Sequence, residues 1–136
     1  MIEYFKLLID FGLLIMVWLV HYSIYPSFQY FSKEELLNWH PKYTRSMMWI
    51  AGPLMLAQLG VSIYVMTISN ATFIILNLVL VITTWLITFL WAVPLHRSIE
   101  QGGNIGTILK KLMKMNRIRA WIWTIIFIWT LKIMTF

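Results

Sequence analysis

The chain contains no cysteine and little charge. Only 12% of its 136 residues are charged, and five acidic side chains stand against eleven Lys and Arg. The lack of cysteine excludes disulfides, Cys-ligated zinc and thiol catalysis. A soluble domain carries about 25% charged residues, so the low charge argues against a soluble fold. The basic excess does not indicate nucleic acid, because the basic residues lie in loops beside long apolar runs.

Apolar residues dominate instead, with 60% hydrophobic and 16% aromatic side chains. A helix needs about 20 apolar residues to cross the roughly 30 Å hydrocarbon core of a bilayer. The chain is therefore predicted to be all-α, a single transmembrane domain over residues 1–136. The predicted spans are residues 5–25, 46–67, 72–95 and 118–135.

The first apolar run is expected to remain in the protein, because no small-residue cleavage pattern follows it. Only "ISNA" joins the second and third spans, so these form a tight antiparallel pair. The sequon that begins at Asn70 lies too close to the bilayer to be glycosylated.

The two long connections are expected to contain short amphipathic helices in the membrane interface. Ser32-x-x-Glu35 has the form of a capping box, which opens a short helix that Pro41 limits. In the second connection, Asn104 is expected to cap a helix over residues 105–119. The apolar and basic faces of that helix suit an anionic membrane surface.

The basic residues are unevenly divided between the two sides of the predicted bundle. Nine of the eleven Lys and Arg lie in or beside residues 26–45 and 96–117, and only Lys6 and Lys132 lie on the other side. The positive-inside rule predicts that both long connections are cytoplasmic. The expected protein is a multi-pass four-helix up-and-down bundle in the bacterial inner membrane, with both termini outside.

Asn116 and Arg119 interrupt an apolar helical face. Asn116 follows Leu109 by seven residues and Arg119 follows Leu112 by seven, so both fall within the apolar arc, away from the lysines. An arginine deep in a span costs about 2.5–3.5 kcal/mol on insertion scales. Two explanations stay open: Arg119 reaches the headgroups while Asn116 caps a backbone kink, or both face an internal pocket that binds a ligand.

Three histidines fall at the same predicted depth as these two residues. His21, His40 and His96 lie near the cytoplasmic ends of separate segments. The predicted catalytic residues are His96, Arg119 and Asn116. The predicted cofactor-binding residues are His21, His96 and His40. Two imidazoles from different helices could hold a haem, although the cofactor's identity stays open. No spacing such as H-x-x-H occurs, so no metal ligands are predicted.

The chemistry of these residues suits a lipophilic ligand with one polar end. Arg119 and Asn116 can bind a carboxylate, a phosphate or a quinone oxygen, and an adjacent imidazole can transfer a proton. Such a ligand would enter sideways from the lipid bilayer between largely apolar walls.

Two polar residues lie deeper in the predicted spans. Asp10 is expected to pair with Lys6, four residues earlier, near the outer interface, although Asp10 also shares a face with His21. Gln58 lies near mid-membrane, where an amide is expected to find an internal partner.

The motifs "HYSIYP", "VPLHRSIEQGG" and "KKLMKMNRIRAWIW" resemble those of small four-span bacterial membrane proteins of unassigned function. The layout is also similar to that of anthrone-oxygenase-like membrane proteins. It resembles the four-helix, haem-containing protoporphyrinogen oxidases in its first-span histidine and its "GP" in the second span, but has "NRIR" where those have Asn-Glu-Pro. These resemblances imply a haem or a flat aromatic substrate.

The leading functional prediction is a membrane oxidoreductase-type enzyme that acts on a lipophilic cyclic or aromatic substrate. One alternative is a non-catalytic membrane subunit, or a lipid- or cofactor-binding module of a larger complex. A transporter is the other alternative, and it would need a homodimer to enclose a pathway.

Overall fold

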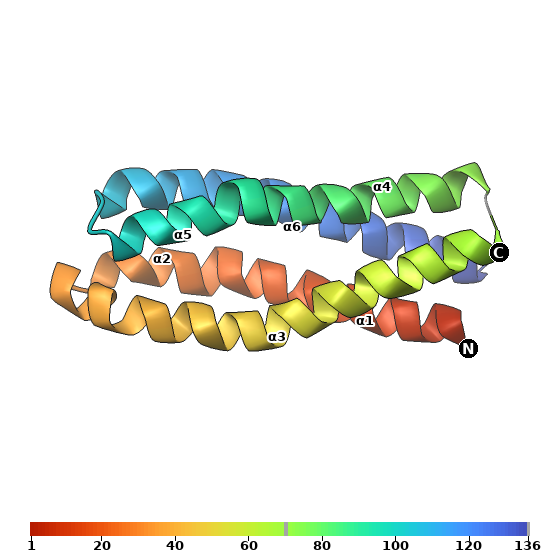
Figure 1. The fold of residues 1–136 in the computed structure, drawn as a ribbon, viewed down its shortest axis with the longest axis horizontal. Coiled ribbons are helices and arrows are strands. Elements are labelled where there is room, and N and C mark those ends of the chain that lie inside the picture. The colour runs from red at the N-terminus through yellow and green to blue at the C-terminus, as the bar shows by residue number, and fades with distance from the viewer. Residues whose placement is uncertain (70, 136) are drawn as a thin grey trace.

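The computed structural model describes residues 1–69 and 71–135, and all regular structure in them is helical. Asn70, the acceptor residue of the sequon, lies outside this part of the chain. Four long helical segments, called here rods, lie side by side (Figure 1). The first rod contains α1 (Ile2–Leu19), the π-helical turn η1 (Val20–Ile24), α2 (Tyr25–Ser27) and the 3-10 turn η2 (Phe28–Tyr30). The other rods are α3 (Lys33–Ile68), then α4 (Thr72–Ile87) with η3 (Thr88–Ala92) and α5 (Val93–Glu100), and finally α6 (Ile105–Thr135).

The rods run alternately up and down, and each packs against two neighbours. Helix α1 contacts α3 and α6, and α4 contacts the same two helices from the other side. The start of α1, the end of α3 and the last turn of α6 lie together at one end, called here the terminal end (Figure 1). The turns before α3 and after α5 lie at the other end, called the loop end.

Three helical stretches of the described chain are long and apolar enough to cross a membrane, which is consistent with a membrane protein. They are Ile2–Tyr30, Lys33–Ile68 and Thr72–Glu100. The first three predicted spans lie within them. The fourth predicted span, residues 118–135, lies within α6, which is not one of the three.

The short interfacial helix predicted in the first connection does not exist as a separate element. The capping box is confirmed, because Glu35 N donates to Ser32 Oγ at 3.2 Å and Ser32 N donates to Glu35 Oε2 at 2.8 Å. The helix then continues through Pro41 to Ile68. Leu36 and His40 before the proline, and Met55 and Gln58 after it, bury their side chains in the bundle, so packing holds the helix on both sides of the proline.

The second predicted interfacial helix is the first half of α6. Asn104 caps it as predicted, since its Oδ1 accepts from Thr107 N at 3.0 Å. This segment runs along the bundle rather than across its end (Figure 1). Its apolar face, including Ile108 and Leu112, is buried in the loop-end core, and the basic face remains exposed.

Gly102 ends α5 in a Schellman motif. Gly103 N donates to Ser98 O at 2.9 Å, Gly102 N donates to Ile99 O at 3.0 Å, and Gly102 has a φ of 79°. A Cβ in this left-handed conformation costs about 1–2 kcal/mol.

We expect Gly102→Ala to lower the free energy of unfolding by that amount in a denaturant titration. Gly60→Ala is the control, because Gly60 is helical with open space around it, and it should be neutral or slightly stabilising.

Candidate functional site

Two of the predicted histidines meet at the loop end. His40 lies on α3 and His96 on α5, and their rings stack with centroids 5.0 Å apart. His40 Nε2 and His96 Nδ1 are 2.9 Å apart, within hydrogen-bond distance. The structure therefore brings together two imidazoles that are 56 residues apart in the chain.

The pair is part of a longer hydrogen-bonded chain. The Tyr25 hydroxyl lies 2.9 Å from His96 Nε2, and His40 Nδ1 lies 3.2 Å from Glu100 Oε1. Tyr25 is 2% exposed, whereas the Glu100 side chain is 39% exposed. This hydrogen-bonded series, called here the histidine relay, consists of Tyr25, His96, His40 and Glu100. It connects a buried phenol to a carboxylate at the surface.

One set of neutral tautomers satisfies every contact of the histidine relay. Tyr25 donates to His96 Nε2, His96 Nδ1–H donates to His40 Nε2, and His40 Nδ1–H donates to Glu100. All three hydrogen bonds then point the same way. Shifting each proton one step leaves a tyrosinate at the buried end and a protonated carboxyl at the surface. This is the arrangement that proton transfer along a chain requires.

Local helix geometry explains how Tyr25 and His96 reach their positions. The π-helical turns η1 and η3 each end two residues before a proline, Pro26 and Pro94 respectively. A proline ring clashes with the carbonyl four residues earlier, and a wider turn gives that carbonyl room. Tyr25 directly follows one such turn, and His96 lies four residues beyond the other.

Aromatic rings enclose the histidine relay. Phe28 is fully buried, and its ring centroid lies 5.7 Å from that of His40 and 5.6 Å from that of Tyr25. Trp39 stacks on Tyr43 with centroids 5.1 Å apart, and the Tyr43 ring also approaches both histidines. Because these rings keep water away, the hydrogen bonds between the imidazoles are strengthened.

Arg119 lies inside the bundle rather than at its surface. It is 9% exposed, and its guanidinium carbon lies 4.9 Å from the centroid of the Trp123 ring. It interacts electrostatically with Tyr25, Tyr43 and His96. Within residues 1–69 and 71–135 no carboxylate pairs with it, and its Nε has no hydrogen-bond partner. A buried cation in this condition is stabilised by an anionic or carbonyl-bearing ligand.

Asn116 is also fully buried, and one end of its side-chain amide bonds to another helix. Its Nδ2 donates to Val17 O at 3.2 Å, on the α1 backbone shortly before η1. Its Oδ1 has no partner among the described residues. One end of the amide thus supports the backbone, and the other end can accept a hydrogen bond from a ligand.

His21 does not join the other two histidines. It is buried beside Trp18 and Tyr22, whose ring centroids lie 5.7 Å and 5.2 Å from its own. In the described part of the chain it makes no hydrogen bond or ring contact with His40 or His96. The prediction that all three line one cofactor pocket is therefore not supported by this geometry.

The ring nitrogens do not fit a haem at the relay. Both nitrogens of His96 and both of His40 already make contacts within the histidine relay, so neither ring offers a free nitrogen to iron in this arrangement. His21 Nδ1 has no hydrogen-bond partner among the described residues, but His21 lies outside the relay. No group of three candidate ligand side chains in the described residues could hold a metal ion.

The sequence prediction missed two members of the histidine relay, Tyr25 and Glu100. One signal was available for Glu100, which follows His96 by four residues and so shares its helix face. Nothing in the sequence paired Glu100 with His40 instead. Nothing in the sequence singled out Tyr25 either, because its partner His96 lies on another rod.

A second buried polar cluster lies toward the terminal end. Asp10 accepts from Lys6 Nζ at 2.6 Å, from Thr130 Oγ1 at 2.7 Å and from Gln58 Nε2 at 2.7 Å. Trp123 Nε1 donates to Gln58 Oε1 at 3.2 Å. The predicted Lys6–Asp10 pair and the predicted internal partner of Gln58 are both confirmed. The pair is buried inside the bundle, because Gln58 of α3 and Thr130 of α6 both bond to it.

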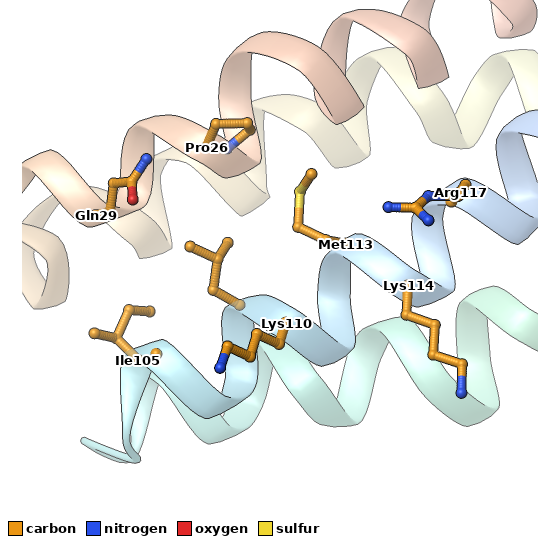
Figure 2. A pocket seen from close by; sticks show the side chains of 9 residues that line it. Pro26, Gln29, Ile105, Lys110, Met113, Lys114 and Arg117 are labelled. Carbon is orange, nitrogen blue, oxygen red and sulfur yellow. The ribbon is translucent and has the colours of Figure 1, made fainter.

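A basic groove runs along the outside of the loop end. Figure 2 shows Pro26 and Gln29 lying across from α6, and Lys110, Lys114 and Arg117 of α6 also line the groove. The groove has a volume of about 760 Å³, and half-buried apolar side chains of α6 form its floor. It can accept the anionic headgroup of a lipid together with part of that lipid's acyl chain.

Comparison of the chain with protein-family models, with curated protein sequences and with solved structures found no match.

Proposed function

We propose that the chain is a four-span protein of the bacterial inner membrane, with both termini outside and the loop end in the cytoplasm. Three helical stretches have the length and composition of spans, and α6 runs beside them; the proposal takes α6 as the fourth span. The excess of Lys and Arg at the loop end supports this orientation.

We further propose that it is an oxidoreductase-type enzyme for a lipophilic cyclic or aromatic substrate. The observation that carries this proposal is the histidine relay, which ends at a buried phenol near an unpaired guanidinium. Arg119 would hold the carbonyl or anionic oxygen of the substrate, and the Asn116 Oδ1 would orient its ring.

Proton removal is the step that these residues can perform. The Tyr25 proton moves to His96, the His96 proton to His40 and the His40 proton to Glu100, and the tyrosinate takes a proton from the substrate. A ring with two hydroxyl groups that has lost one proton can then give two electrons and its second proton to dioxygen, which dissolves in the hydrocarbon core. The ring becomes a quinone, and dioxygen becomes hydrogen peroxide when the first proton is returned. No step is assigned to a haem, because the relay imidazoles have no free nitrogen. The resemblance to anthrone-oxygenase-like proteins is in keeping with this chemistry.

The first test identifies the ligand. The protein is purified in mild detergent, bound small molecules are extracted, and mass spectra are compared for wild type, Arg119→Leu and Arg45→Leu. We expect a cyclic compound with an acidic or carbonyl oxygen in wild type and Arg45→Leu, and at least a tenfold loss in Arg119→Leu. Arg45 is the control because it is an exposed arginine outside the site.

The extracted compound is then incubated with the protein under air and its oxidation is followed by absorbance. Conversion by wild type supports the enzyme. Retention of the compound by Arg119→Leu at the wild-type level would contradict the proposed binding site.

The basic groove favours a second candidate function, a non-catalytic module that binds lipid for a larger complex. Its cationic side chains lie next to apolar ones, as an anionic phospholipid requires (Figure 2). This candidate predicts that wild type retains phospholipid, converts no cyclic compound and copurifies with a larger membrane protein. Conversion without such a partner favours the enzyme.

A further inference from the structure

A separate cavity lies at the terminal end, opposite the histidine relay. Its volume is about 210 Å³, and it is lined by residues of α1, α3, α4 and α6. Pockets for drug-sized ligands measure about 300–1,000 Å³, so this cavity suits a single ring. Phe73, Ile74 and Ile133 belong to its apolar wall.

Two residues that line this cavity each carry a buried polar atom without a partner in the described chain. The atoms are Asn77 Nδ2 on α4 and Ser62 Oγ on α3, and the two residues are 4% and 2% exposed. Buried amide and hydroxyl groups in native proteins almost always have a hydrogen-bond partner. A ligand with an acceptor oxygen would supply that partner to both.

The charges around the cavity favour an uncharged ligand that accepts hydrogen bonds. Lys6 lines it, but Asp10 neutralises the ammonium at 2.6 Å and Thr130 takes a second hydrogen bond from it at 3.1 Å. Glu3 also lines the cavity, and its carboxylate pairs with the N-terminal ammonium of Met1 at 3.3 Å. Because both of these charged side chains already have a partner of opposite charge, the lining favours a neutral carbonyl over a phosphate or carboxylate.

We propose that this cavity binds the carbonyl-bearing ring of a neutral, lipid-soluble molecule of the quinone class. Asn77 and Ser62 donate hydrogen bonds to its oxygen, and the ring packs against the apolar wall. The site is independent of the histidine relay and does not rest on the function proposed for it. The competing occupant is water, because the volume would hold several molecules at about 30 Å³ each.

The test uses two small probes of the same shape. Duroquinone carries two carbonyl oxygens on a tetramethylated ring, and durene is the same ring without them. Each is titrated calorimetrically against the full chain in lipid nanodiscs. We expect saturable binding of duroquinone and none of durene. Absence of saturable duroquinone binding would mean that the cavity holds water only, and equal binding of both probes would mean apolar partitioning; either result overturns the proposal.

Variants then locate the site. We expect Asn77→Leu to weaken duroquinone binding at least tenfold without lowering the melting temperature, because it removes a buried donor that has no partner. Thr83→Val is the matched control on α4, since the Thr83 hydroxyl bonds the Val79 carbonyl of its own helix, and duroquinone binding to this variant should equal wild type.

A further variant, His96→Phe, should also bind duroquinone normally. If His96→Phe abolishes binding while Asn77→Leu does not, duroquinone occupies the histidine relay region and the proposal for this cavity is wrong.

Discussion

Replacing Asp10 with alanine is expected to lower the free energy of unfolding by about 3–5 kcal/mol, as removal of one partner from a buried ion pair does. Asp10 is completely buried and accepts three hydrogen bonds, from Lys6, Gln58 and Thr130. The substitution leaves the Lys6 ammonium buried without a counter-ion and removes the acceptor of an amide and a hydroxyl. The measurement is unfolding in mixed micelles by SDS titration, followed by tryptophan fluorescence.

The control for Asp10→Ala is the double variant Lys6→Met with Asp10→Leu. Replacing a whole buried ion pair with apolar side chains of similar size is often neutral, so most of the lost stability should return. Gln58 still lacks one acceptor in this variant, so recovery is expected to be incomplete. If Asp10→Ala unfolds within about 1 kcal/mol of wild type, the buried pair does not contribute as its burial implies.

The second large effect is expected at the buried end of the histidine relay. Tyr25→Phe should reduce turnover of the compound extracted from wild type by about 10²- to 10⁴-fold, the range of general acid–base catalysis. The substitution deletes the hydroxyl that lies 2.9 Å from His96 Nε2 and keeps the ring that packs on Phe28. Turnover is measured by oxidation of that compound under air.

Tyr22→Phe is the matched control, because Tyr22 is 72% exposed and its hydroxyl lies outside the relay. It should turn over substrate at the wild-type rate. A readout independent of activity is the nitrogen-15 NMR spectrum of the imidazoles, in which His96 and His40 should both show the Nδ1–H tautomer. Equal turnover by Tyr25→Phe and wild type would remove the relay from the mechanism.

Trp123 connects the two polar regions of the bundle. Its indole N–H donates to Gln58 of the buried polar cluster around Asp10. Its ring lies against the guanidinium of Arg119. One fully buried side chain therefore positions groups on both sides of the bundle's midpoint. An apolar residue of similar size would leave the Gln58 carbonyl without its donor and Arg119 without its cation–π contact.

Local features of the fold could be predicted because each depends on neighbours within one turn or one helix. The capping box at Ser32, the cap at Asn104 and the Lys6–Asp10 pair span three or four residues, so sequence spacing was sufficient. Helical periodicity likewise placed Asn116 and Arg119 within the apolar arc, and both are buried, although the sequence left open whether Arg119 reaches the headgroups. The helix break at Pro41 was predicted wrongly, because packing on both sides of the proline outweighed its local preference.

The sequence by itself determined that the chain is helical, apolar enough for a membrane and capped at Ser32 and Asn104. Only the tertiary structure decided which polar groups meet. His40 and His96 come from different rods, Tyr25 from a third, and His21 remains outside although it lies at a similar depth. The physical reason is that the donor–acceptor distance of a hydrogen bond can vary by only a few tenths of an ångström. Moving a side chain by one position along a helix, in contrast, rotates its direction by about 100°. Side-chain packing between rods determines how each helix is rotated, and the residue spacing within a single helix does not predict that rotation.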